Sequence, residues 1–132
     1  MSNYGLLVID MQPKFLEDIR EKESVLENTI NTIEASRDNN MPIYLVKMGY
    51  DSEVDERIKN TAIDYSPITK EKNNAFSNTD LYQNLEQDNI DNLVIAGINA
   101  HACVKKTTEE AVQKYNIITS KDIIGDMIPP EE

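Results

Sequence analysis

A chain of 132 residues, 39% hydrophobic and 28% charged, has room for one domain with a sizeable core and none for a separate substrate domain. The formal net charge of -11 argues against a nucleic-acid or anionic-membrane partner, because phosphate binding needs clustered Lys and Arg, which are scattered here. The apolar runs are too short to cross a bilayer, no signal-peptide pattern precedes Gly5, and one cysteine allows no internal disulfide. We expect a single cytoplasmic domain over residues 1–132.

The first third of the chain predicts a strand, a helix and a second strand. Residues 4–10 form a continuous apolar run that ends in Asp10, which is typical of a parallel strand covered on both faces. Apolar side chains recur at helical spacing over residues 24–37, and residues 42–47 predict a strand entered from Pro42.

The same alternation of helices and strands continues to residue 120. Residues 49–60 are polar and predict a loop with a short helical piece. The further expected elements are a strand at 67–70, a helix from Thr79 to about Gln87, a strand at 92–96, a helix at 103–115 and a strand at 116–120.

This alternation predicts a three-layer α/β/α sandwich around a parallel sheet of about five strands in the order 3-2-1-4-5. In such a sheet, ligands bind beyond the carboxyl ends of the strands, where the strand order reverses. Asp10 ends the first strand, and Cys103 follows the fourth. If these two strands are neighbours, the two side chains meet at the same crevice.

Cys103, the only cysteine, stands where the fourth strand gives way to a tight turn and a helix. Free N–H groups and the helix dipole at a helix N-terminus favour the thiolate, which is the nucleophilic form. The alternative is that Cys103 is a small buried hydrophobic residue, as most free cysteines are.

Three segments together resemble the isochorismatase-like cysteine hydrolases, which have a Rossmann-like fold. They are residues 7–12, Lys70 followed six residues later by Phe76, and residues 97–104 around Cys103. The resemblance covers residues 4–122 and implies a catalytic triad of Asp10, Lys70 and Cys103. Asp10 would accept the thiol proton, and Lys70 would stabilise the thiolate.

The resemblance also implies how the attack of sulfur on an amide carbonyl is supported. The oxyanion needs preorganised donors, and the N–H groups of Ala100 and Cys103 would supply them after a cis peptide bond between Asn99 and Ala100. The candidate pocket residues are Gln12, Phe15, Phe76 and His101.

Several of these residues have plainer interpretations. Asp10 could cap the following loop, and the lysine of the site could be Lys72 instead of Lys70. Phe76 could belong to the core, Gln12 could order a turn, and His101 could face solvent.

The chain departs from its relatives in three places. Many nicotinamidases of this family carry a metal-binding Asp-x-His after the second strand, whereas residues 47–51 here hold no histidine, so we expect neither metal nor cofactor. The loop residues Ala100 and His101 are atypical. The chain also stops before the final helix and strand of its relatives, so we expect a shortened domain that forms a homo-oligomer.

The predicted function is a metal-independent cysteine hydrolase that cleaves a C–N bond of a small amide or ureido substrate through a Cys103 thioester. One alternative is an inactive binding or structural protein with the same fold. Another is a hydrolase of vinyl ethers such as isochorismate, which would not need the cysteine.

Overall fold

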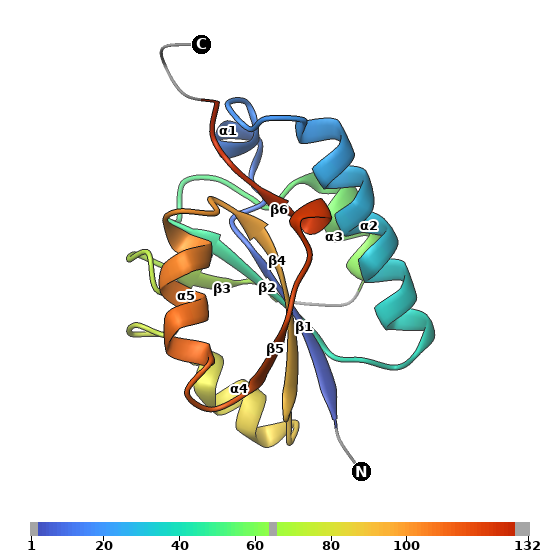
Figure 1. Cartoon of the computed structure of the whole chain (residues 1–132), viewed down its shortest axis with the longest axis vertical. Helices are drawn as coiled ribbons and strands as arrows, with labels where there is room; N and C mark the ends of the chain where they lie inside the picture. The colour runs from blue at the N-terminus through green and yellow to red at the C-terminus, as the bar shows by residue number, and fades with distance from the viewer. Residues whose placement is uncertain (1–2, 64–65, 129–132) are drawn as a thin grey trace.

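In the computed structural model, which describes residues 3–63 and 66–128, a parallel sheet forms the centre of the molecule (Figure 1). Its main strands follow the order β3-β2-β1-β4-β5, as the sequence predicts. They are β1 (Tyr4–Ile9), β2 (Ile43–Met48), β3 (Ile68–Lys70), β4 (Asn92–Ile98) and β5 (Asn116–Ile118).

Helices cover both faces of this sheet (Figure 1). On one face lie α2 (Lys22–Asp38) and α3 (Glu56–Ala62), and on the other lie α4 (Leu81–Gln87) and α5 (Cys103–Ala111). Strand β1 explains the two layers, because Leu6 and Val8 pack in one core cluster and Leu7 and Ile9 in the other. The continuous apolar run of β1 therefore has the two covered faces that it predicts.

Three short elements are absent from the sequence prediction. They are the one-turn helix α1 (Pro13–Leu16), the 3-10 helix η1 (Lys121–Ile123) and strand β6 (Ile124–Gly125). Strand β6 pairs with β4 beyond the end of β5, so the sheet has six strands instead of five. In addition, α5 ends at Ala111, four residues earlier than predicted.

The chain after β6 crosses back to the loop between α1 and α2. Arg20 N donates to Asp126 O, Ile128 N donates to Asp18 O, and Ile19 bridges to Met127. Residues 125–128, named here the C-terminal strap, thus join the end of β4 to the chain that follows β1. Within the described part of the chain, no helix is long and apolar enough to span a membrane.

Gly97 allows β1 and β4 to approach closely just before both strands end. Its φ is +143°, and a Cβ there would lie 2.4 Å from the carbonyl oxygen of Ile9. Only glycine combines this backbone conformation with this contact. The close approach brings the residue after β1 next to the loop after β4.

Candidate active site

Three side chains from distant parts of the chain meet at the carboxyl edge of the sheet. Lys70 Nζ lies 3.0 Å from Asp10 Oδ2 and 3.2 Å from Cys103 Sγ. Asp10 follows β1, Lys70 ends β3, and Cys103 begins α5. The structure thus brings together the three residues that the sequence singles out, and we call them the Asp10–Lys70–Cys103 cluster.

Lys70, and not Lys72, is the lysine of this cluster. The side chain of Lys70 has no exposed surface, whereas Lys72 is an exposed residue. Lys72 contributes its backbone carbonyl, which accepts a hydrogen bond of 3.1 Å from Lys70 Nζ. With Met48 Sδ at 4.0 Å as a fourth acceptor, none of the three N–H bonds of the ammonium is left free.

Asp10 is buried at a sharp turn. Its φ is 56°, a conformation that few residues other than Gly, Asn and Asp adopt, and its carbonyl accepts from Gln12 N at 2.7 Å. Burial raises the pKa of Asp10 above its usual value of 3.8, while the charge of Lys70 acts in the opposite direction. A carboxylate with a raised pKa is a stronger base toward a thiol than an ordinary one.

Cys103 keeps its proton at neutral pH. Burial raises the pKa of the thiol from 9.0 to about 11, and the negative charge of Asp10 adds to the effect, while Lys70 lowers the pKa. The direction of this shift is opposite to the one expected from the helix N-terminus. Desolvation is the largest cause of the raised pKa, because Cys103 is buried.

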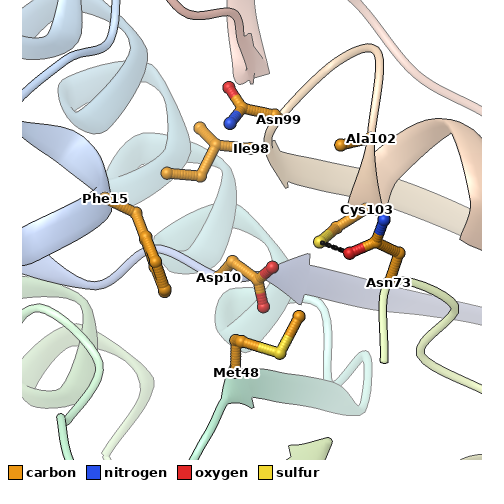
Figure 2. Close-up of a pocket in the computed structure, with 8 residues that line it drawn as sticks. All are labelled: Asp10, Phe15, Met48, Asn73, Ile98, Asn99, Ala102 and Cys103. Atoms are coloured by element: carbon orange, nitrogen blue, oxygen red, sulfur yellow. Dashed lines mark hydrogen bonds between the residues drawn. The ribbon is translucent and has the colours of Figure 1, made fainter. Parts of the chain in front are cut away.

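A pocket of about 190 Å³ opens above the cluster (Figure 2). Figure 2 shows the Asp10 carboxylate and the Cys103 sulfur close to each other, with Phe15 and Met48 on the side of Asp10. The Cys103 thiol donates to Asn73 Oδ1 at 3.5 Å. The lining residues are Asp10, Phe15, Met48, Asn73, Ile98, Asn99, Ala102 and Cys103.

Of the four predicted pocket residues, only Phe15 lines this pocket. Gln12 is fully buried and bonds to Met48 N, Met48 O and Ser52 Oγ, so it orders a turn. Phe76 belongs to the core and packs against Tyr82, with the ring centroids 4.2 Å apart. The side chain of His101 is 82% exposed and lies 3.2 Å from Asp126.

The other lining residues are missed by the sequence analysis, although their positions carry a signal. Met48 ends β2, Ile98 ends β4, and the carboxyl ends of parallel strands mark the ligand side of the sheet. Asn73 lies three residues after Lys70, in a segment already singled out.

The loop before Cys103 differs from the prediction in two details. The cis peptide bond joins Ile98 and Asn99, one residue earlier than expected, directly where β4 ends. Ala100 N donates to Gly125 O at 2.9 Å, because the C-terminal strap runs beside this loop. The expectation of Ala100 as an oxyanion donor is therefore wrong for this structure.

The N–H of Cys103 is a better candidate for that role. It belongs to the first residue of α5 and makes no hydrogen bond with any other described residue. Among residues 3–63 and 66–128, no group of three or more His, Cys, Asp and Glu side chains could hold a metal ion.

The fold and the pocket define a doubly wound α/β protein with a buried thiol at the ligand side of its sheet. Residues 4–129 match the sequence model of the isochorismatase domain. The chain belongs to the isochorismatase family, whose members include hydrolases.

Known relatives include amidases. An N-carbamoylsarcosine amidase of an Arthrobacter species is 35% identical over 81 residues, which are 61% of this chain and 30% of that protein. The solved structure of an N-carbamoylsarcosine amidase from Thermoplasma acidophilum superposes with a TM-score of 0.82 at 25% identity, covering 98% of this chain and 87% of that one. A probable inactive nicotinamidase of Arabidopsis thaliana is 28% identical, covering 83% of this chain and 73% of its own.

Proposed function

We propose that this protein is a metal-independent cysteine hydrolase that cleaves a C–N bond of a small amide or ureido compound through a Cys103 thioester. The observation that carries the proposal is the position of Lys70 Nζ, in hydrogen-bond contact with both the Asp10 carboxylate and the Cys103 sulfur. The two amidases among the relatives support a C–N bond as the target.

In the proposed first step, the thiol proton leaves only as the sulfur attacks. Because the resting pKa of Cys103 is about 11, a preformed thiolate is scarce, and a base must take the proton during attack. Asp10, whose pKa is raised by burial, is that base. Lys70 stabilises the negative charge while it lies on the sulfur.

The new bond joins Cys103 Sγ to the carbonyl carbon, and the carbonyl oxygen becomes an oxyanion. The free N–H of Cys103 supplies one donor for this oxygen. When the intermediate collapses, the C–N bond breaks, Asp10 returns the proton to the nitrogen, and ammonia or an amine leaves. Water then attacks the thioester carbon, with Asp10 again taking a proton. The C–S bond breaks, the acyl group leaves as the acid, and Asp10 returns the proton to the Cys103 sulfur.

The proposal is tested by incubating the protein with small primary amides and ureido compounds and measuring released ammonia. We expect turnover in the wild type and a loss of at least ~1,000-fold in Cys103→Ala, because no nucleophile remains. Rapid acid quenching followed by mass spectrometry should find the acyl group on Cys103. Turnover that persists in Cys103→Ala would contradict the thioester.

The role of Lys70 is tested against a matched lysine. Lys70→Ala removes a buried charge from the cluster and should lower turnover by at least ~100-fold. Lys72→Ala removes an exposed side chain and keeps the backbone carbonyl that Lys70 contacts, so its turnover should stay near that of the wild type. Equal losses in the two variants would contradict the assignment of Lys70.

A second candidate is a protein that binds an amide without hydrolysing it. The hydrogen bond from Ala100 N to Gly125 O favours it, because this N–H is not available to an oxyanion, and so does the relative named as inactive. Under this hypothesis, calorimetry would detect amide binding while no ammonia is released from any compound tested.

We also propose that the protein works in the cytoplasm as a homo-oligomer. A reducing compartment would keep the Cys103 thiol free for the reaction. The exposed apolar side chains at the β5 edge of the sheet support self-association.

A further inference from the structure

We propose that the pocket excludes anionic acyl groups, so that the substrate is a small amide or ureido compound without a carboxylate or phosphate. This inference rests on the proposed function, since it concerns the selectivity of the same pocket. It begins with Lys70, the only cation in the Asp10–Lys70–Cys103 cluster.

Lys70 has no N–H left for a substrate anion. An ammonium has three N–H bonds, and those of Lys70 point to Asp10 Oδ2, Lys72 O and Cys103 Sγ at 3.0, 3.1 and 3.2 Å. Its side chain is also completely buried and does not line the pocket, whereas Asp10 and Cys103 do. A substrate carboxylate would have to displace Asp10, whose own negative charge would repel it.

The pocket wall offers no other cation. None of its described lining residues is Lys, Arg or His, and Asp10 is the charged one. Phe15, Met48 and Ile98 supply apolar surface. A carboxylate that entered would lose its hydration without gaining a charged partner, which strongly disfavours binding.

Two basic side chains near the pocket lie against carboxylates outside it. Lys14, beside Phe15, binds both carboxylate oxygens of Asp51, at 3.1 and 3.2 Å. His101 lies 3.2 Å from Asp126. Lys72 is exposed and does not line the pocket.

Two side-chain amides give the pocket its polarity. Asn99 Oδ1 is buried and accepts no hydrogen bond from any described residue, and Asn73 holds its amide beside the thiol (Figure 2). A buried acceptor without a donor is unfavourable, and an N–H group of a substrate would satisfy it. The amide or ureido NH2 group has this chemistry, whereas a carboxylate has no proton to donate.

The size of the pocket limits the acyl group. Its volume of about 190 Å³ lies below the range of ~300–1,000 Å³ for pockets that hold drug-sized ligands. The substrate is therefore compact, with an apolar acyl group that packs against Phe15 and Met48.

The test compares two alkylating reagents of equal size on the intact protein. Iodoacetamide and iodoacetate both form a bond from Cys103 Sγ to their CH2 group and release iodide, but one carries a neutral amide and the other a carboxylate. At one pH, the rate of alkylation of Cys103 by iodoacetamide is divided by the rate with iodoacetate. This ratio is then divided by the same ratio measured for glutathione. This quotient cancels the thiolate fraction and the intrinsic reactivity of the reagents.

We expect the quotient to be at least tenfold in favour of iodoacetamide. A quotient below threefold overturns the proposal. Because alkylation needs no turnover, this result is independent of whether the protein hydrolyses amides. Selective alkylation without ammonia release would leave the proposal standing and reject the proposed function.

A cation placed on the wall should remove the selectivity. Phe15→Lys adds a charge at the pocket and should lower the quotient at least threefold, whereas Phe15→Met, which changes the shape without charge, should keep it. Tyr4→Lys adds the same charge at the start of β1, six residues before Asp10, where the strands begin. This variant therefore controls for the change in net charge. Equal quotients in Phe15→Lys and Tyr4→Lys would overturn the proposal.

Discussion

Asp10 and Cys103 both have raised pKa values because both are buried, yet the consequences for the two groups differ. For Asp10, a raised pKa makes the carboxylate a stronger base. For Cys103, a raised pKa keeps the nucleophile protonated. The reactivity of the site therefore depends on Asp10 and Cys103 acting together and not on a free thiolate.

This difference predicts the pH dependence of thiol alkylation. Because the folded pKa of Cys103 is about 11, the rate of reaction with iodoacetamide should still rise with pH at pH 10. Stopped-flow alkylation on the folded protein measures it. A plateau below pH 9 would contradict the raised pKa.

Asp10→Asn should separate thiol ionisation from catalysis. Asp10 raises the pKa of Cys103 by its charge, so its removal should lower that pKa and speed alkylation near pH 8. Hydrolysis should nevertheless fall by at least ~100-fold, because the general base is gone. Both rates are measured on one sample, and a parallel fall of the two would contradict the role of Asp10 as base.

At the level of strands and loops, the contact between β1 and β4 controls where Asp10 lies. Gly97 pairs with Ile9, the residue before Asp10, and its Cβ-free backbone permits that contact. A side chain at Gly97 would push apart the two strands whose ends carry the base and the nucleophile.

Gly97→Ala should therefore destabilise the protein and reduce turnover together. We expect a loss of ~3 kcal/mol or more in the free energy of unfolding, from the positive φ and the clash with Ile9. Gly5→Ala is the control, because a Cβ there meets only side-chain atoms of Tyr44 and Ile90, at 3.1 and 3.2 Å. Urea unfolding measures the free energy of unfolding of the two variants. Equal losses of stability in Gly97→Ala and Gly5→Ala would contradict this explanation.

Gln12 fastens the loop after β1 to the end of β2. Gln12→Met removes three hydrogen bonds and leaves the half-buried N–H and carbonyl of Met48 without this partner, so we expect a loss of ~2–3 kcal/mol in unfolding free energy. Gln87→Met, at an exposed position, should change it by less than ~0.5 kcal/mol. Urea unfolding measures both variants. Equal changes in unfolding free energy for Gln12→Met and Gln87→Met would contradict this role of Gln12.

The sequence predicts those helices and strands that have a clear local pattern of apolar residues. The apolar run of β1 and the alternation of helices and strands suffice for the strand order, and the order places Asp10 beside the loop of Cys103. Strand β6 escapes prediction because two residues carry no periodicity and pair only through the folded β4. Gln12 and Phe76 show the limit at the site, because the direction of a side chain depends on packing that a motif does not specify.

For the whole molecule, the edges of the sheet suggest how copies of the chain could associate. β5 has three residues and pairs only with β4 among the described strands. Nearby, Ile118 is 42% exposed and Val112 61% exposed. An open strand edge with apolar side chains favours pairing with another chain.

We expect sedimentation velocity to show a dimer at micromolar concentration. Ile118→Lys should raise the dissociation constant of this dimer at least tenfold. Ile63→Lys, which changes another exposed apolar side chain outside β5, should leave the dimer intact. A wild-type protein that stays monomeric over the whole concentration range would reject self-association through this edge.

The C-terminal strap has a consequence for the order of events during synthesis. The cluster joins residues 60 and 33 positions apart, and the loop before Cys103 is fixed by Gly125. A ribosome must therefore have added the residues up to Gly125 before the loop that carries the thiol is fixed. We expect nascent chains that end before Gly125 to carry a Cys103 as reactive as an ordinary thiol, so that the protected state of this cysteine reports completed folding.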